Sequence, residues 1–152
     1  KNVRIGLGLS LIIIIAASFY YYLNQYFNIY PKAYSRDWQY GYKQAVQYVT
    51  TIQNGYEKVN ITGFYGRPYI YFLFYNKYSP EKYWLNRSAY RDQFGFWVVN
   101  SFDKYNFADN LPAKIGKTLY VDKPDTNLSC KKLLKTIYDL NTQPVFLISE
   151  GI

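Results

Sequence analysis

Two short segments hold the side chains best suited to chemistry. In "GFYGR", Tyr65 and Arg67 follow the alternating segment "KVNI", which predicts a β-strand. In "NSFDKY", Asp103 and Tyr105 follow the apolar run "FGFWVV", which predicts a strand buried on both faces. Ligands of open α/β sheets bind beyond the carboxyl ends of parallel strands, so these four residues form the candidate ligand-binding site.

The glycine-containing loop "GFYGR" precedes a predicted helix. Such a loop can receive a phosphate group, with which Arg67 would pair. Its glycine spacing matches no recognised phosphate loop. An ordinary turn with a surface arginine is therefore the favoured alternative.

The composition excludes several kinds of catalytic site. The 152 residues include no histidine and one cysteine, Cys130, which excludes Ser-His and Cys-His pairs, an internal disulfide and a cysteine metal cluster. Asp122 and Asp125 enclose Lys123 and Pro124 and lack a third ligand at metal spacing, which indicates a turn. We predict no catalytic residue, metal site or cofactor within this stretch, and we do not expect an independent hydrolase.

The opening segment is long and apolar enough for a transmembrane helix. It extends from Ile5 to Leu23 without a charge, and a helix of that length reaches about 28 Å, close to the thickness of a bilayer's hydrocarbon core. Aromatic residues follow at one end, where an interfacial belt is expected, so residues 1–27 are the predicted span. A signal peptide cleaved near Ser18 is the alternative. Because the chain has no methionine, we expect that Lys1 is not a natural start.

The charged residues predict orientation and partners. Lys1 and Arg4 flank the first end of the span, so the positive-inside rule places residues 28–152 outside the cytoplasm. The formal charge is +8, but the basic residues are scattered, whereas nucleic-acid binders gather them on one face. We expect a cell-membrane protein whose partners include the lipid bilayer and no nucleic acid.

Residues 28–152 alternate between helical and strand patterns. Pro31 is expected to end the first helix within the linker "NIYPKAYSRD", with Ser35 available as a helix cap. Helices are predicted over residues 36–53, 69–76 and 81–85, and the aromatic and β-branched residues of 69–76 also suit a strand, which is the alternative for that segment. Strands are predicted at "KVNITGFY", "FGFWVVNSF" and "KTLYV", and "LLKTIYD" with "QPVFLIS" indicates a closing hairpin. The prediction is a small, three-layer-like α/β domain of about five strands, whose first two strands are parallel in a βαβ unit.

Two aromatic-rich stretches, "DWQYGYKQAVQYV" and "PYIYFLFYNKYSPEKY", are followed by the strand "FGFWVV". Together they resemble the C-terminal extracytoplasmic region of polytopic bacterial glycosyltransferases related to dolichyl-phosphate-mannose protein mannosyltransferases and aminoarabinose transferases. The resemblance covers residues 35–100 well and the last fifty residues loosely. Its motifs contain no catalytic residue.

This resemblance implies a function for the chain as a piece of a larger enzyme. Such enzymes transfer a sugar from a polyprenyl-phosphate donor, using acidic residues of an early outer loop and often a divalent metal. We therefore expect the last span and accessory domain of such an enzyme, which would meet its remaining transmembrane domain and a lipid-linked sugar or acceptor. The alternative is a singly anchored extracytoplasmic binding or assembly module without catalysis.

Overall fold

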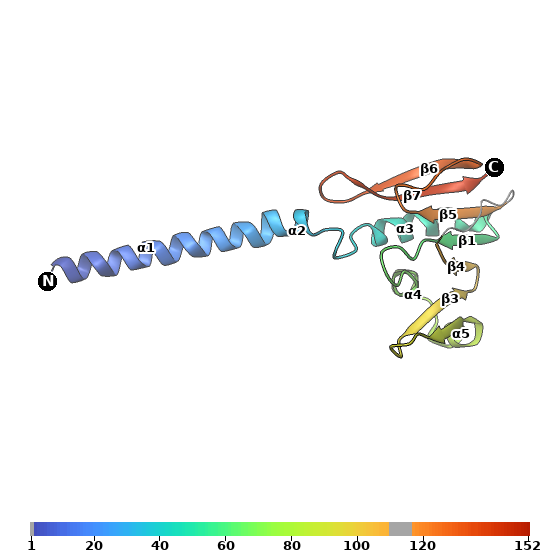
Figure 1. The fold of residues 1–152 in the computed structure, drawn as a ribbon, viewed down its shortest axis with the longest axis horizontal. Helices are drawn as coiled ribbons and strands as arrows, with labels where there is room; N and C mark the ends of the chain where they lie inside the picture. The colour runs from blue at the N-terminus through green and yellow to red at the C-terminus, as the bar shows by residue number, and fades with distance from the viewer. Residues whose placement is uncertain (1, 110–116) are drawn as a thin grey trace.

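The computed structural model describes residues 2–109 and 117–152, in which a long helix leads into a mixed α/β domain (Figure 1). The helical elements are α1 (Asn2–Asn24), η1 (Gln25–Ile29), α2 (Tyr30–Ala33), α3 (Tyr42–Ile52), η2 (Gln53–Gly55), α4 (Tyr69–Tyr75) and α5 (Pro80–Asn86). The strands are β1 (Lys58–Ile61), β2 (Ser88–Arg91), β3 (Trp97–Phe102), β4 (Tyr105–Phe107), β5 (Thr118–Asp122), β6 (Lys131–Tyr138) and β7 (Pro144–Gly151). The predicted α/β class with one apolar N-terminal helix is confirmed.

The opening helix projects from the domain (Figure 1). Helical structure covers Val3–Ala33, and within it an 18-residue stretch has a mean hydropathy of 2.0 with none of its residues buried. Its side chains are apolar on all sides, as in a helix that is solvated by lipid rather than by water. By length and composition, this helix can cross a membrane.

The predicted helix break at Pro31 is wrong. Helical structure continues through Pro31 to Ala33, after the π-helical turn η1. A proline lacks the N–H of an α-helical bond and its ring crowds the carbonyl four residues earlier. The turn before it bonds over five residues instead, from Tyr30 N–H to the Gln25 carbonyl, and so accommodates the proline without ending the helix.

The helix predicted over residues 36–53 begins later, at Tyr42. Gln39 and Gly41 both have positive φ angles, of 57° and 107°, which a helix cannot contain. At Gly41, the Phe146 and Val145 side chains lie 3.4 Å from where a Cβ would be. The glycine thus permits both the left-handed turn and the close approach of β7.

The sheet has seven strands in the order β2-β3-β4-β1-β5-β7-β6, rather than about five. The short strands β2 and β4 were not predicted. β1 pairs parallel with both β4 and β5, whereas β3 pairs antiparallel with β4. The expectation that β1 and the "FWVV" strand lie parallel is therefore wrong: the chain crosses over through α4 and α5, makes β2 and β3, and only then returns beside β1. The C-terminal hairpin, β6 with β7, is confirmed.

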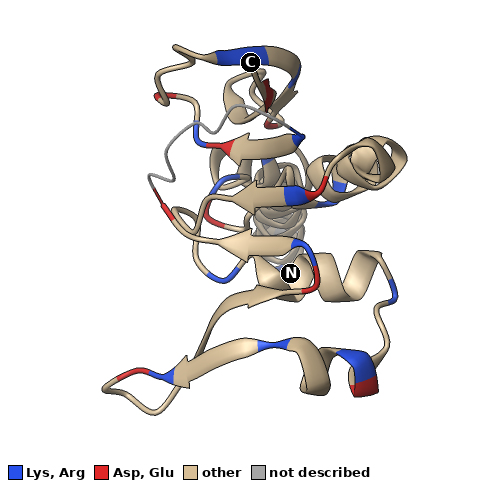
Figure 2. Cartoon of the chain, turned by 90° about the vertical axis from the view of Figure 1, so that its right-hand side faces the viewer, with Lys and Arg blue, Asp and Glu red and all other residues tan. Residues whose placement is uncertain are grey.

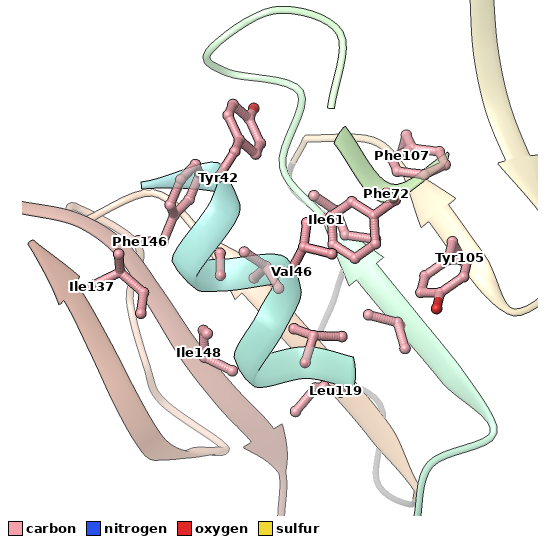
Figure 3. Close-up of a cluster of buried hydrophobic side chains, with 14 of the residues drawn as sticks. Tyr42, Val46, Ile61, Phe72, Tyr105, Phe107, Leu119, Ile137, Phe146 and Ile148 are labelled. Atoms are coloured by element: carbon pink, nitrogen blue, oxygen red, sulfur yellow. The ribbon is translucent and has the colours of Figure 1, made fainter. Parts of the chain in front are cut away.

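One face of the sheet packs against α3 and α4, and the core lies between these layers (Figure 3). Val46 and Val49 of α3 and Phe72 of α4 are fully buried against alternate residues of the central strands, such as Ile61 and Leu119. The spacing of the apolar residues in α3 is helical and in β1 and β5 is alternating, so each element turns one apolar face to this core.

The other face of the central strands is more polar. Asn106, Asn60, Tyr120 and Ser149 are register neighbours on β4, β1, β5 and β7. The Asn106 side chain donates a hydrogen bond to Asn60 Oδ1 at 3.2 Å. Among the described residues the helices α3, α4 and α5 all pack toward the core face, which gives two layers instead of the expected three-layer-like arrangement.

Candidate functional site

The four predicted site residues separate into two groups. Tyr65 and Arg67 follow the carboxyl end of β1. Asp103 lies in the β3–β4 turn, and Tyr105 begins β4 beside Val59, near the amino end of β1. Because β3 runs antiparallel to β4, its carboxyl end lies at the opposite edge of the sheet. The two groups therefore do not form one site.

The loop after β1 is occupied by internal contacts. The Arg67 guanidinium lies 3.4 Å from Asp92 Oδ2 and 4.9 Å from the centre of the Phe96 ring. Tyr65 packs edge-on against Phe146, with ring centres 5.3 Å apart, and its carbonyl accepts a hydrogen bond from Gln39. These contacts favour the turn-forming alternative over a phosphate site.

Asp103 and Tyr105 instead line a polar pocket at the other edge. The cavity is about 460 Å³ and lies between the ends of α3 and α4 and the β3–β4 turn. Its lining is Thr50, Gln53, Asn54, Tyr75, Asn76, Lys77, Tyr78, Asp103, Lys104 and Tyr105. We call this cavity the polar pocket.

A chain of hydrogen bonds orders the wall of the polar pocket. The Tyr105 hydroxyl donates to Gln53 Oε1 and accepts from Asn76 Nδ2 at 3.1 Å. Asn76 Oδ1 accepts from Thr50 Oγ1 at 2.7 Å, and Lys104 Nζ donates to the Gln53 carbonyl at 2.9 Å. These side chains come from α3, from η2, from the end of α4, from the β3–β4 turn and from β4, so the network holds the pocket's shape.

Two non-glycine residues at the polar pocket have left-handed backbones. Lys77 has a φ of 48° and Asp103 a φ of 49°. Lys77 ends α4 in a Schellman arrangement, in which the Tyr78 N–H bonds to the Leu73 carbonyl at 3.0 Å and the Lys77 N–H to the Phe74 carbonyl at 3.2 Å. Both turns direct charged residues to the pocket at a backbone cost that glycine would avoid.

The electrostatics of the polar pocket suit binding better than proton transfer. Burial raises the pKa of Tyr105 to about 12, although its hydrogen bond with Gln53 lowers that pKa. The phenol is therefore protonated at neutral pH. Amide, hydroxyl and ammonium groups together match a polar, hydroxyl-bearing ligand. Within residues 2–109 and 117–152, no group of three His, Cys, Asp or Glu side chains could hold a metal ion.

Sequence reasoning missed Thr50, Gln53 and Asn76 as members of this pocket. In the sequence, these residues look like ordinary helix ends: Thr50 and Gln53 lie at the end of one helix, and Asn76 lies at the end of another. Only the packing of α3 beside α4 brings them to Tyr105. No spacing in the chain signals this.

Comparisons with known proteins give no match. No family model, no curated protein and no solved structure matches this chain. The glycosyltransferase resemblance therefore rests on the aromatic-rich motifs alone.

Proposed function

We propose that this chain is the last membrane span and extracytoplasmic accessory domain of an integral-membrane glycosyltransferase that uses a polyprenyl-phosphate sugar donor. The observation that supports it best is the exposed apolar helix that leads directly into the α/β domain. None of the residues in its 18-residue apolar stretch is buried. Lys1 and Arg4 before the apolar run favour an outside domain. The catalytic groups would belong to other parts of the enzyme.

The residues behind the resemblance pack together. Tyr42, from the first motif, stacks on Tyr71 from the second, with ring centres 4.4 Å apart and nearly parallel planes. Tyr83, from the end of the second motif, lies edge-on to Phe102 of β3 at 5.5 Å. The residues of the two motifs thus contribute to one helical layer that packs on the sheet.

The polar pocket gives this domain a role in substrate contact. In Figure 1 the β1 arrow points toward the α1 side, so the pocket, at the amino ends of β1 and β4, lies on the side of the sheet away from α1. A pocket so placed faces the aqueous phase rather than the bilayer. We infer that it contacts the hydroxyl-bearing acceptor.

The second candidate is a singly anchored extracytoplasmic binding module. The polar pocket favours it as well, because it has the groups of a binding site and lacks a carboxylate pair among its described lining residues. In that case the same pocket would be the main functional site.

Labelling of Cys130 tests the orientation. Cys130 is the chain's single cysteine and is exposed, so a membrane-impermeant maleimide should label it in intact cells before lysis. Cys130→Ser is the control for background. Labelling only after lysis would place the domain in the cytoplasm and contradict the proposal.

The full reading frame tests the enzymatic role. We expect further spans upstream of Lys1 and sugar transfer from a polyprenyl-phosphate donor by the full-length product. Tyr105→Phe in that enzyme should raise the KM for the acceptor severalfold with little change in kcat, because it removes the hydroxyl that bonds to Gln53 and Asn76 in the polar pocket. A frame without further spans, or without transfer activity, would favour the binding module instead.

A further inference from the structure

An apolar groove lies where the long helix meets the domain. It has a volume of about 380 Å³ and is lined by Tyr26, Phe27, Tyr30, Pro31, Ser35, Trp38, Tyr40 and Leu140. These residues come from η1 and α2, from the turn before α3, and from the β6–β7 turn. We call it the junction groove; Figure 1 shows the β6–β7 turn reaching back to α2.

Polar contacts on both sides fix the junction groove. Asn141 Nδ2, in the β6–β7 turn, donates to the Lys32 carbonyl at 2.7 Å. Arg36 bridges to the same turn through Asp139 Oδ2 at 2.9 Å and the Pro144 carbonyl at 3.2 Å. Trp38 Nε1 donates to the Tyr30 hydroxyl at 3.2 Å. The groove is thus a built feature rather than a gap along a loose linker.

Its walls expose large apolar side chains to solvent. Phe27 is 66% exposed and Trp38 is 72% exposed, and Leu140 at the far wall is 41% exposed. Exposed apolar surface of this size is unfavourable in water, at about 25 cal/mol per Å². A concave apolar surface between fixed walls indicates an apolar occupant.

The level at which the junction groove lies in the membrane identifies that occupant. Between Arg4 and Lys32 the chain has 27 uncharged residues, which as a helix reach about 40 Å. That length matches a whole bilayer including both headgroup layers, about 40–45 Å. The groove residues Tyr26 to Pro31 close this stretch and therefore lie at headgroup level. Tyr and Trp, with apolar rings and polar tips, are the residues enriched at that level.

We propose that the junction groove binds a phospholipid of the adjacent leaflet, and that the domain thereby rests on the membrane. The glycerol backbone and the first carbons of the acyl chains pack against Phe27, Trp38 and Leu140. The lipid phosphate lies near Lys32, the first charge after the span. This inference rests on the proposed span but not on the glycosyltransferase role.

Tryptophan quenching in the full chain, reconstituted in phosphatidylcholine nanodiscs, tests the site. A Trp38-only variant (Trp84→Phe, Trp97→Phe) is compared with a Trp84-only variant (Trp38→Phe, Trp97→Phe). Trp84 is 62% exposed on α5, which lies away from α1 in Figure 1. Phospholipid brominated at upper acyl positions should quench Trp38 at least twofold more than Trp84, and aqueous acrylamide should quench Trp84 more.

A second pair of variants protects the test against misfolding of the single-Trp proteins. Leu140→Asp in the Trp38-only protein places a charge in the junction groove and should cut lipid quenching of Trp38 at least by half. Leu85→Asp, at an 84% exposed position of α5, should leave it unchanged. Far-UV circular dichroism of each variant checks the fold.

Two results would overturn the proposal. Equal lipid quenching of Trp38 and Trp84 would mean that the domain stands clear of the bilayer. Protection of Trp38 from both the brominated lipid and acrylamide would mean that a protein surface, and not a lipid, covers the groove. Resistance to alkaline carbonate extraction, measured in native membranes, reports separately on the span.

Discussion

Tyr42 shows how this chain uses its many tyrosines. Its side chain is 1% exposed and its ring lies between Tyr71, at 4.4 Å, and Phe146, at 4.8 Å. Its hydroxyl is buried without a hydrogen-bond partner among the described residues. Burial raises the pKa of this phenol well above its ordinary value of 10.0. Tyr42 therefore stabilises the domain through its ring and not through its hydroxyl.

We predict that Tyr42→Phe raises the free energy of unfolding by up to about 1 kcal/mol, because a buried unpaired hydroxyl costs about 1–3 kcal/mol that the phenylalanine avoids. Urea unfolding of the full chain in detergent, followed by near-UV circular dichroism, measures this. Tyr20→Phe, on the exposed helix, is the matched control and should change nothing. A loss of stability in Tyr42→Phe would reveal a partner for the hydroxyl.

Asp139 is the buried charge of the junction. Its side chain is 3% exposed and accepts hydrogen bonds from Arg36 Nε, at 2.9 Å, and from the N–H groups of Asn141 and Gln143. Desolvation alone raises the pKa of Asp139, but the bonds from Gln143, Arg36 and Asn141 outweigh it and hold the pKa below the ordinary 3.8. The ionised form is therefore the one that stabilises the fold.

This shift predicts a pH dependence. A carboxyl with a lowered pKa in the folded state contributes stability that is present above its unfolded value, near 4, and is lost as the pH falls through its folded pKa. Asp139→Asn should cost about 1–3 kcal/mol at pH 7, and this difference from the wild type should shrink below about pH 4. Thermal unfolding between pH 7 and pH 2.5 measures both. A difference that is constant with pH would contradict the role of ionisation.

The residues at the ends of the helices determine where each helix begins and ends. Gly41 delays the start of α3, and Lys77 closes α4 in the left-handed conformation. At α5, Ser79 precedes Pro80 and its hydroxyl accepts from the Lys82 N–H at 3.4 Å. Serine at the cap and proline in the first turn are the usual start of a helix.

For α5, we predict that Ser79→Ala lowers the free energy of unfolding by about 1 kcal/mol, the usual cost of losing a helix cap. Ser88→Ala, at an exposed position of β2, is the control and should stay within about 0.5 kcal/mol of the wild type. Chemical denaturation of both variants measures the difference. Equal stability of the two would mean that the long 3.4 Å contact contributes nothing.

The domain depends on an aromatic core that the helical layer shares with the sheet (Figure 3). Phe102 lies at the edge of this core and is fully buried. The ring centres of Tyr78, Tyr83, Tyr105 and Phe107 lie 5.1–5.5 Å from the centre of the Phe102 ring. Charge is distributed differently: Figure 2 shows Lys and Arg spread over several strands, loops and α5. Apolar contact, not charge, therefore holds the layers together.

We predict that Phe102→Ala lowers the free energy of unfolding by about 3–5 kcal/mol, because it leaves a cavity among four rings. Phe94→Ala, at a 75% exposed position in the β2–β3 turn, is the matched control and should cost less than about 0.5 kcal/mol. Urea titration of the full chain in detergent distinguishes them. A small effect of Phe102→Ala would mean that the core can close around the missing ring.

Features that depend on local pattern could be predicted from the amino-acid sequence. An uncharged apolar run needs no partner to be recognised, and so the long helix was predicted from composition alone. Helical spacing predicted part of α3, and the prolines at their starts indicated α4 and α5. Alternation predicted β1, and short apolar segments indicated β5 and the β6–β7 hairpin. The α/β class follows from these elements together.

Strand order, helix continuity at Pro31 and the polar pocket could not be predicted in this way. The direction of β3 depends on β4, a three-residue strand whose pairing energy comes from distant neighbours rather than from its own pattern. That direction separated Asp103 from Arg67 and placed it beside Gln53 and Asn76. Contacts between segments far apart in the chain leave no regular spacing of residues in either segment. The reason is that each segment only has to fit the surface of its partner, which requires no particular pattern.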